Sequence, residues 1–227
     1  MRIAIIAALM FFISACVLPT APSTDPTPEQ APPAPAFATE FLIEYAVIME
    51  QRSQGGSSQN SMLMDVAYRN GVVRYDMFEN PVYVLDGTII ACFFDECDVM
   101  EDDSFTYAYA WNELVAMDNP SAYAAGSVLM RDALMMLEPE TPSELSFIED
   151  ALKTLPVSAD CYDFTTAQGH DARFCVNDGY PLFARLSGTR TLADYPDMPI
   201  TFDEQFIAIG VRPLPEGYLD IPVPENT

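Results

Sequence analysis

The chain has 227 residues, of which 50% are hydrophobic, and it carries 34 acidic and 10 basic side chains for a formal net charge of −24 at pH 7. A negative field of this size repels phosphate backbones and anionic lipid headgroups, so nucleic acid is excluded as an expected partner. An acidic, solubilising surface is the simplest interpretation, and a dedicated site for cations or a basic protein is the alternative.

Residues 1–15 have the three regions of an export signal. Arg2 is basic, residues 3–13 are apolar, and small residues precede Cys16. The apolar run is too short to span a bilayer, which takes roughly 20 residues. The tetrapeptide Ile13-Ser14-Ala15-Cys16 resembles the lipobox of prokaryotic lipoproteins. That resemblance implies cleavage before Cys16, a diacylglyceryl group on its sulfur, and a protein anchored to the membrane that faces the periplasm or the cell exterior. The alternative is an ordinary secretory signal with a chance cysteine at the cut.

Residues 16–37 are expected to form a lipidated tether, and residues 38–227 a single domain. Seven prolines lie between residues 17 and 36, mixed with Ala, Ser and Thr. Such a segment favours extended polyproline II, at ~3.1 Å per residue, rather than a packed core. The remaining chain is long enough to bury roughly 70% of its unfolded surface around one core.

The first part of the domain alternates between apolar and polar residues, as half-buried strands do. The expected strands are 41–50, 61–69, 72–78, 82–85 and 88–94. Asn70-Gly71 and Asp86-Gly87 are typical of tight hairpin turns, so the strands predict an antiparallel meander. Six acids then follow between Asp95 and Asp103. We interpret residues 95–103 as a solvated acidic loop, with a calcium loop as the alternative, because the spacing lacks the glycine and alternating ligands of an EF-hand.

The middle of the chain changes to helical spacing. Thr141-Pro142-Ser143-Glu144 is a capping box, and the apolar residues that follow it predict a helix that ends at Pro156. A second helix is expected from Asn119 to Leu137, whereas residues 104–117 fit a helix or a strand.

Strands are expected again at 161–167, 173–176, 182–186, 189–193 and 202–211. Strands, then helices, then strands around one core indicate an α+β fold. We expect a curved antiparallel sheet, a half-barrel meander, with the helical insert packed on its concave face.

Four cysteines remain once Cys16 is assigned to lipid. They are Cys92, Cys97, Cys161 and Cys175. Outside the cytoplasm an even set of this kind predicts two disulfides, for which three connectivities are possible. Loop-closure entropy favours the sequence neighbours, Cys92 with Cys97 and Cys161 with Cys175. A four-sulfur zinc site is the alternative, although the spacing does not suit one.

The tether and the order of elements resemble the LolA/LolB and LppX-type lipoproteins. Local matches are Val82-Tyr83-Val84-Leu85-Asp86-Gly87 and the closing segment 202–224. The resemblance implies an unclosed barrel plugged by helices, with hydrophobic cargo held in the space between them. The four internal cysteines and the long helical middle depart from that pattern.

One face of the first strands is rich in methionine and tyrosine. Methionine is flexible and polarizable, so such a wall adapts to irregular apolar shapes, including acyl chains. A core filled by the helices is the alternative. The candidate ligand-binding residues are Tyr45, Met49, Met62, Met64, Tyr68, Tyr75 and Met77.

The sequence gives little support for catalysis. The chain lacks a G-x-S-x-G elbow, an H-E-x-x-H pair and a phosphate-binding glycine loop, and we expect the single histidine, His170, to be an exposed turn residue. We therefore expect a protein that is not an enzyme and that needs no cofactor or metal. The leading hypothesis is a lipoprotein that binds or carries a lipid or acyl chain. The alternative is a structural or adaptor lipoprotein that binds a protein partner through its acidic surface.

Overall fold

The computed structural model describes residues 36–53, 55–77, 80–93, 96–100, 105–117, 124–192 and 195–221. All of them belong to one compact unit, Pro32–Thr227. Over these residues the chain forms eleven strands and three helices. The fold is a sheet-dominated α+β fold, as the sequence predicts.

The first half of the sheet is a meander that is longer than expected. Its strands are β1 (Glu40–Ser53), β2 (Gly56–Arg69), β3 (Val72–Met77), β4 (Asn80–Leu85), β5 (Thr88–Phe93) and β6 (Glu96–Met100). Asn70 and Gly71 have φ values of 52° and 88°, and Asp86 and Gly87 have φ values of 48° and 80°. These left-handed pairs form the two predicted hairpin turns. The expectation of a loop over 95–103 is wrong for residues 96–100, because β6 pairs with β5 along its whole length.

The helical middle differs from its prediction in one place. Residues 104–117 fit a helix or a strand by sequence, and their described part forms helix α1 (Thr106–Ala116). Helix α3 (Pro142–Thr154) begins at the predicted capping box. Between them, the single helix expected from Asn119 to Leu137 is wrong. Over its described part the chain forms β7 (Ala124–Leu129) and then the short helix α2 (Met130–Met135). Pairing with β8 (Ser158–Thr165) explains the difference, because a sheet edge overrides a weak local preference for helix.

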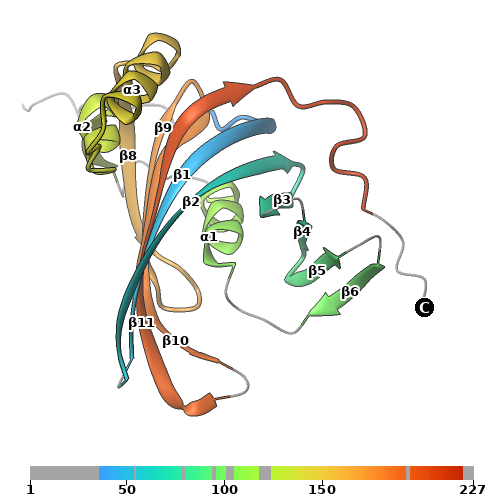
Figure 1. Ribbon diagram of the computed structural model, residues 1–227. Coiled ribbons are helices and arrows are strands. Elements are labelled where there is room, and N and C mark those ends of the chain that lie inside the picture. Colours follow the sequence, from blue (N-terminus) through green and yellow to red (C-terminus); the bar gives the residue numbers. More distant parts are fainter. Residues whose placement is uncertain are drawn as a thin grey trace, which may run out of the picture. The chain divides into compact units, whose positions relative to one another are not determined.

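The remaining strands return to the centre of the sheet. They are β9 (Asp171–Asn177), β10 (Tyr180–Leu192) and β11 (Tyr195–Arg212). Strand β10 runs through both of the short strands expected there. The sheet is antiparallel throughout, in the order β6-β5-β4-β3-β2-β1-β11-β10-β9-β8-β7, and it is open and curved (Figure 1). Helix α1 lies inside the curve, and α2 and α3 lie on the other face (Figure 1).

Helix α1 is held to the sheet by apolar and polar contacts. Tyr107, Trp111 and Leu114 recur at helical spacing and are at most 1% exposed. On its other side, the Asn112 Nδ2 donates to the Gly71 carbonyl at 3.2 Å, and the Ala167 N–H donates to the Glu113 carboxylate at 2.9 Å. These bonds tie α1 to hairpin turns in both halves of the sheet.

Phe37 and Ala38, just before β1, are packed against the domain. The Phe37 ring meets Trp111 and Tyr162 edge to face, with centroids at 5.5 and 6.1 Å. The Ala38 N–H donates to the Gly179 carbonyl at 3.0 Å. A Cβ on Gly179 would lie 2.6 Å from the Ala38 nitrogen, so only glycine fits in this turn.

We therefore expect Gly179→Ala to destabilise the protein more than Gly169→Ala does. Both glycines have positive φ, 87° and 83°, but a Cβ at Gly169 meets no atom within 4 Å. At Gly169 the backbone strain of an alanine with positive φ lowers the free energy of unfolding by about 1 kcal/mol. At Gly179 the clash of the new Cβ with the backbone near Ala38 lowers it by about 1 to 3 kcal/mol more. Urea unfolding of the two variants measures the difference. Equal losses would mean that the entry of the chain is not fixed at this turn.

Candidate functional site

Four of the predicted ligand-binding residues are buried, and the three tyrosines among them contact α1. Tyr45, Met64, Tyr68 and Tyr75 are at most 6% exposed. The Tyr45 and Tyr107 ring centroids lie 5.8 Å apart, and those of Tyr68 and Trp111 lie 5.9 Å apart. This face of the sheet is thus a packed aromatic layer, filled by α1.

The other three predicted residues lie at the margin of this layer or outside the description. Met49 and Met62 are partly buried and pack against the core. The side chain of Met77, at the end of β3, lies outside the described residues. Among the described methionines of this face, Met49 and Met62 are therefore partly accessible and Met64 is not.

The buried tyrosines in this layer are uncharged, and Tyr45 and Tyr107 are hydrogen-bonded to each other. The Tyr45 hydroxyl donates to the Pro181 carbonyl, so Tyr107 donates to Tyr45, at an O–O distance of 3.0 Å. Burial raises the pKa of Tyr45, Tyr75 and Tyr107, because the phenolate would lose its solvation. These groups stabilise the core, and we assign them no acid–base role.

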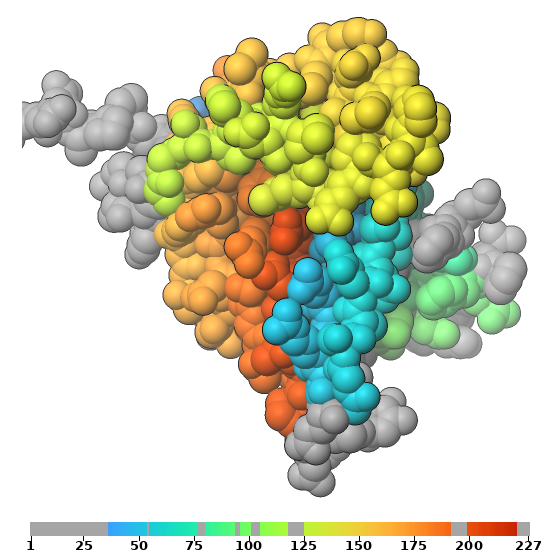
Figure 2. All heavy atoms as spheres, turned by 60° about the vertical axis from the view of Figure 1, so that its left-hand side comes forward, coloured from blue at the N-terminus to red at the C-terminus, as the bar shows by residue number. Residues whose placement is uncertain are grey.

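A groove of about 880 Å³ lies on the opposite face of the sheet, between strands β1 and β2 and helices α2 and α3. Figure 2 shows this face, with the helices (lime to yellow) across the sheet and β1 and β2 (blue to cyan) uncovered below them. Ala46 and Ile48 of β1 form its floor, since they alternate with the inward-facing Tyr45. The groove is large enough for a small hydrophobic molecule.

Apolar side chains on both walls of the groove are unusually exposed. Leu63 on β2 is 59% exposed, Met136 after α2 is 48% exposed, and Phe147 on α3 is 42% exposed. Each would lose contact with water if an apolar molecule filled the groove. An exposed apolar patch that contains polar neighbours is typical of a binding surface.

The capping box and the buried face of α3 position the groove wall. The Glu144 N–H donates to the Thr141 hydroxyl at 3.3 Å, and the Thr141 N–H donates to the Glu144 carboxylate at 2.9 Å. Ile148 and Ala151 are buried against the core, which leaves Phe147 on the side of the groove. The helix is thus fixed at its start and along one face, and it presents the phenyl ring to the groove.

A buried polar cluster lies on the α1 face, where β10 and β11 pair. The Arg190 Nη1 lies 3.2 Å from the Glu204 carboxylate, and both side chains are 7% exposed. The Thr106 hydroxyl donates to Glu204 at 2.9 Å. Burial raises the pKa of Glu204, while Arg190 and Thr106 oppose that shift. The cluster fixes the start of α1 to β11.

His170 belongs to the same region, and the expectation that it is an exposed turn residue is wrong. It is 5% exposed, and its ring meets Phe202 edge to face at 5.0 Å. A Cβ on Gly188 would lie 2.7 Å from the His170 ring, so the glycine in β10 makes room for the imidazole. The turn sequence could not show that β10 covers this position.

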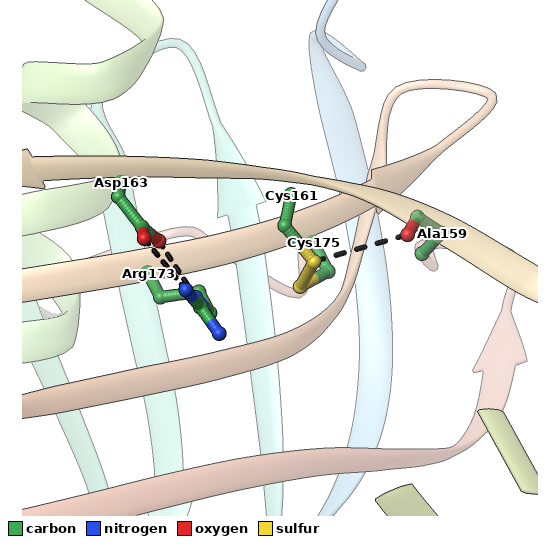
Figure 3. The surroundings of a disulfide bond; sticks show 5 residues. All are labelled: Ala159, Cys161, Asp163, Arg173 and Cys175. Carbon is green, nitrogen blue, oxygen red and sulfur yellow. Dashed lines mark hydrogen bonds and ion pairs between the residues drawn. A yellow bond between two sulfur atoms is a disulfide. The ribbon is translucent and has the colours of Figure 1, made fainter. Parts of the chain in front are cut away.

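Both disulfides form with the expected pairing, and each joins directly opposed residues of neighbouring strands. Cys92 bonds Cys97 across β5 and β6, and Cys161 bonds Cys175 across β8 and β9. Figure 3 shows the second bond beside the ion pair between Asp163 and Arg173. Disulfides persist in oxidising compartments, so they indicate an extracytoplasmic protein.

Some of the remaining predictions fall on parts of the chain that are not described. Cys16 lies outside the described residues, as do Asp95 and residues 101–103 of the acidic segment. Within the described ranges, no set of three His, Cys, Asp or Glu side chains is arranged to hold a metal ion. No helix there has the length and apolarity needed to cross a membrane.

The groove is not among the sites expected from the sequence. One signal was present: Phe147 is a large apolar residue outside the helical stripe of Ile148, Ala151 and Leu155. That position predicts exposure unless a partner covers it. The other wall could not be anticipated, because the face of β2 that carries Leu63 meets α3 only through the tertiary fold.

Comparison with known proteins gives no family assignment. No family model matches the chain, and no curated protein matches it significantly.

Proposed function

We propose that this protein is a membrane-anchored, extracytoplasmic lipoprotein that binds a hydrophobic ligand, a lipid or an acyl chain, in the groove between β1–β2 and α2–α3. The observation that carries the proposal is a groove of about 880 Å³ whose walls expose Leu63, Met136 and Phe147. The proposed role is binding or carrying, without catalysis and without a cofactor.

The architecture supports a relation to the LolA/LppX-type lipoproteins. Helix α1 lies inside the curve of the open sheet, as a half-barrel with a helical insert on its concave face requires. The expectation is wrong for α2 and α3, which lie on the other face. The chain differs from the arrangement that the resemblance implies, because aromatic packing fills the space between α1 and the sheet. We therefore place the ligand on the outer face.

The anchor is tested by Cys16→Ser. If a diacylglyceryl group on Cys16 holds the protein to the membrane, the variant is expected to move to the soluble fraction, because no other lipid-bearing sulfur would remain. Fractionation and the mass of the mature N-terminus measure this. A variant that still sediments with membranes, beside a wild-type protein without acyl mass, would contradict the anchor.

The groove is tested by a matched pair on α3. Phe147 lines the groove and Leu145 does not, and the two side chains are 42% and 44% exposed. We expect Phe147→Gln to weaken the binding of a fluorescent acyl probe by roughly 10-fold, because it removes about 1.5 kcal/mol of apolar contact with the chain. Leu145→Gln is expected to leave the affinity within about 2-fold, and both variants to keep their stability within about 0.5 kcal/mol.

If Phe147→Gln and Leu145→Gln changed the affinity for the probe equally, the probe would bind outside the groove. If the wild-type protein binds no acyl probe, the carrier proposal fails.

One observation favours the alternative of an adaptor that binds a protein. Several exposed apolar side chains surround α2 and α3 without lining the groove. They are Leu129, Met135, Leu145 and Val157. A protein partner could cover this surface. Absence of acyl binding, together with loss of a partner on Leu129→Gln and Leu145→Gln, would favour the adaptor.

A further inference from the structure

We propose that the groove selects amphiphiles whose headgroup is cationic, an apolar chain with an ammonium or a similar group. This inference rests on the proposed function and names the chemistry of its ligand. It follows from the charges around the groove, from their pairing and from one buried acceptor inside it.

The charged residues that line the groove are all acidic. They are Glu50 at the β1 side, Glu138 in the connection between α2 and α3, and Glu144 in the first turn of α3. Among the described lining residues there is no lysine, arginine or histidine. An anionic headgroup would meet like charges here, and a cationic one would meet opposite charges.

The three carboxylates are not neutralised equally. Glu144 accepts hydrogen bonds from the backbone of Thr141 and Glu140, which holds its pKa below the usual range, so it stays ionised. Glu50 lies 3.6 Å from Arg52 in a pair that is exposed to water. Glu138 forms no ion pair with any described residue. Glu138 is therefore the carboxylate best placed to meet a ligand cation.

Of the basic residues on α2, α3 and β10, Lys153 and Arg185 are paired, and Arg131 on α2 does not line the groove. Lys153 lies 2.7 Å from Asp150, and Arg185 pairs with Asp203. The chain as a whole carries a net charge of −24. The negative potential at the groove is thus not cancelled locally, and it extends over about a Debye length, ~8 Å at physiological salt.

A buried acceptor inside the groove matches the same headgroup. Gln205 on β11 lines the groove, and its Oε1 is buried without a hydrogen-bond partner among the described residues. A buried acceptor gains most from a donor that the ligand brings. An ammonium group has three donors and no acceptor, so it suits a groove whose charged and unpartnered side chains are acceptors.

The test compares three ligands of equal chain length, dodecylamine, dodecanol and dodecanoate, below their micellar concentrations. Each competes with a neutral fluorescent acyl probe on the full chain carrying Cys16→Ser, at pH 7. We expect the amine to bind about 10-fold more tightly than the carboxylate, with the alcohol between them. We expect 0.5 M salt to reduce this preference, because the groove is open to solvent.

A matched pair of variants locates the selectivity. Glu138→Gln is expected to lower the preference for the amine about 2- to 5-fold and to leave dodecanol binding unchanged. Glu140→Gln removes the same charge from an exposed residue nearby that does not line the groove, and it is expected to have less effect.

The outcomes separate the two proposals. If all three ligands bind equally, or if the carboxylate binds best, the cationic selectivity is wrong while hydrophobic binding in the groove stands. If Glu140→Gln changes the preference as much as Glu138→Gln does, the selectivity belongs to the overall charge and not to the groove, and the inference is overturned. If none of the three displaces the probe and the probe itself does not bind, both proposals fail.

Discussion

Trp111→Ala is expected to lower the free energy of unfolding by about 3 to 5 kcal/mol, the cost of deleting a large buried aromatic side chain. Trp111 is fully buried on α1. Its ring lies 5.5 Å from those of Phe37, Phe41 and Phe174 and 5.9 Å from that of Tyr68. It therefore joins the helix to the chain entry, to β1 and β2, and to β9.

Because Trp111 is the only tryptophan, unfolding of this variant should be followed by far-ultraviolet circular dichroism in urea. Leu145→Ala on α3 is the control, with an expected loss below about 0.5 kcal/mol, because Leu145 is 44% exposed. Similar small losses in both variants would mean that α1 is not packed inside the sheet as described.

Arg190→Met is expected to cost about 3 to 5 kcal/mol, because it leaves the Glu204 carboxylate buried without its cation. Arg185→Met is the matched control on the same strand. Arg185 also pairs with an acid on β11, Asp203, but its side chain is 53% exposed, so we expect a loss of about 1 kcal/mol or less. Urea unfolding at pH 7 measures both, and equal losses would contradict the burial of the Arg190–Glu204 pair.

The cost of Arg190→Met should also depend on pH. Burial already raises the pKa of Glu204 above 4.5, and losing Arg190 raises it further. Between 4.5 and that raised pKa, the folded variant holds a proton that the unfolded chain has released, so stability falls as pH rises through this window. The deficit relative to wild type should therefore be smallest near pH 4 and largest at neutral pH. Adding Glu204→Gln to the variant should remove this dependence.

The features that could be predicted from the sequence are those that local chemistry decides. The Asn70-Gly71 turn follows from the positive φ of both residues, and the start of α3 follows from the bonds between Thr141 and Glu144. Pairing of Cys161 with Cys175 follows from the short loop between them. In each case the residues that determine the structure are close together in the sequence.

The features that could not be predicted depend on distant partners. Residues 124–129 form β7 because β8 offers an edge, and residues 96–100 form β6 because β5 does. His170 is buried because β10 and Phe202 cover its turn. The groove arises where α3 lies beside the outer face of β1 and β2, which no local pattern encodes.

The role of the methionine and tyrosine face also depends on a distant partner. Alternation along β1 and β2 placed Tyr45, Met64 and Tyr68 on one face, and the structure has them there. Whether that face lines a cavity or a core depends on what packs against it. Helix α1 brings Tyr107 and Trp111 to it, so the face became core.

The central claim is that the groove on the outer face of the sheet holds an apolar chain. It is tested most directly by photolabelling the full chain carrying Cys16→Ser with a photoactivatable fatty amine, followed by peptide mass spectrometry. We predict labels on Leu63, Met136 and Phe147, which an excess of unlabelled dodecylamine suppresses. Labels on Tyr45, Tyr68 or Tyr75 instead, or labelling that the competitor does not suppress, would contradict the claim.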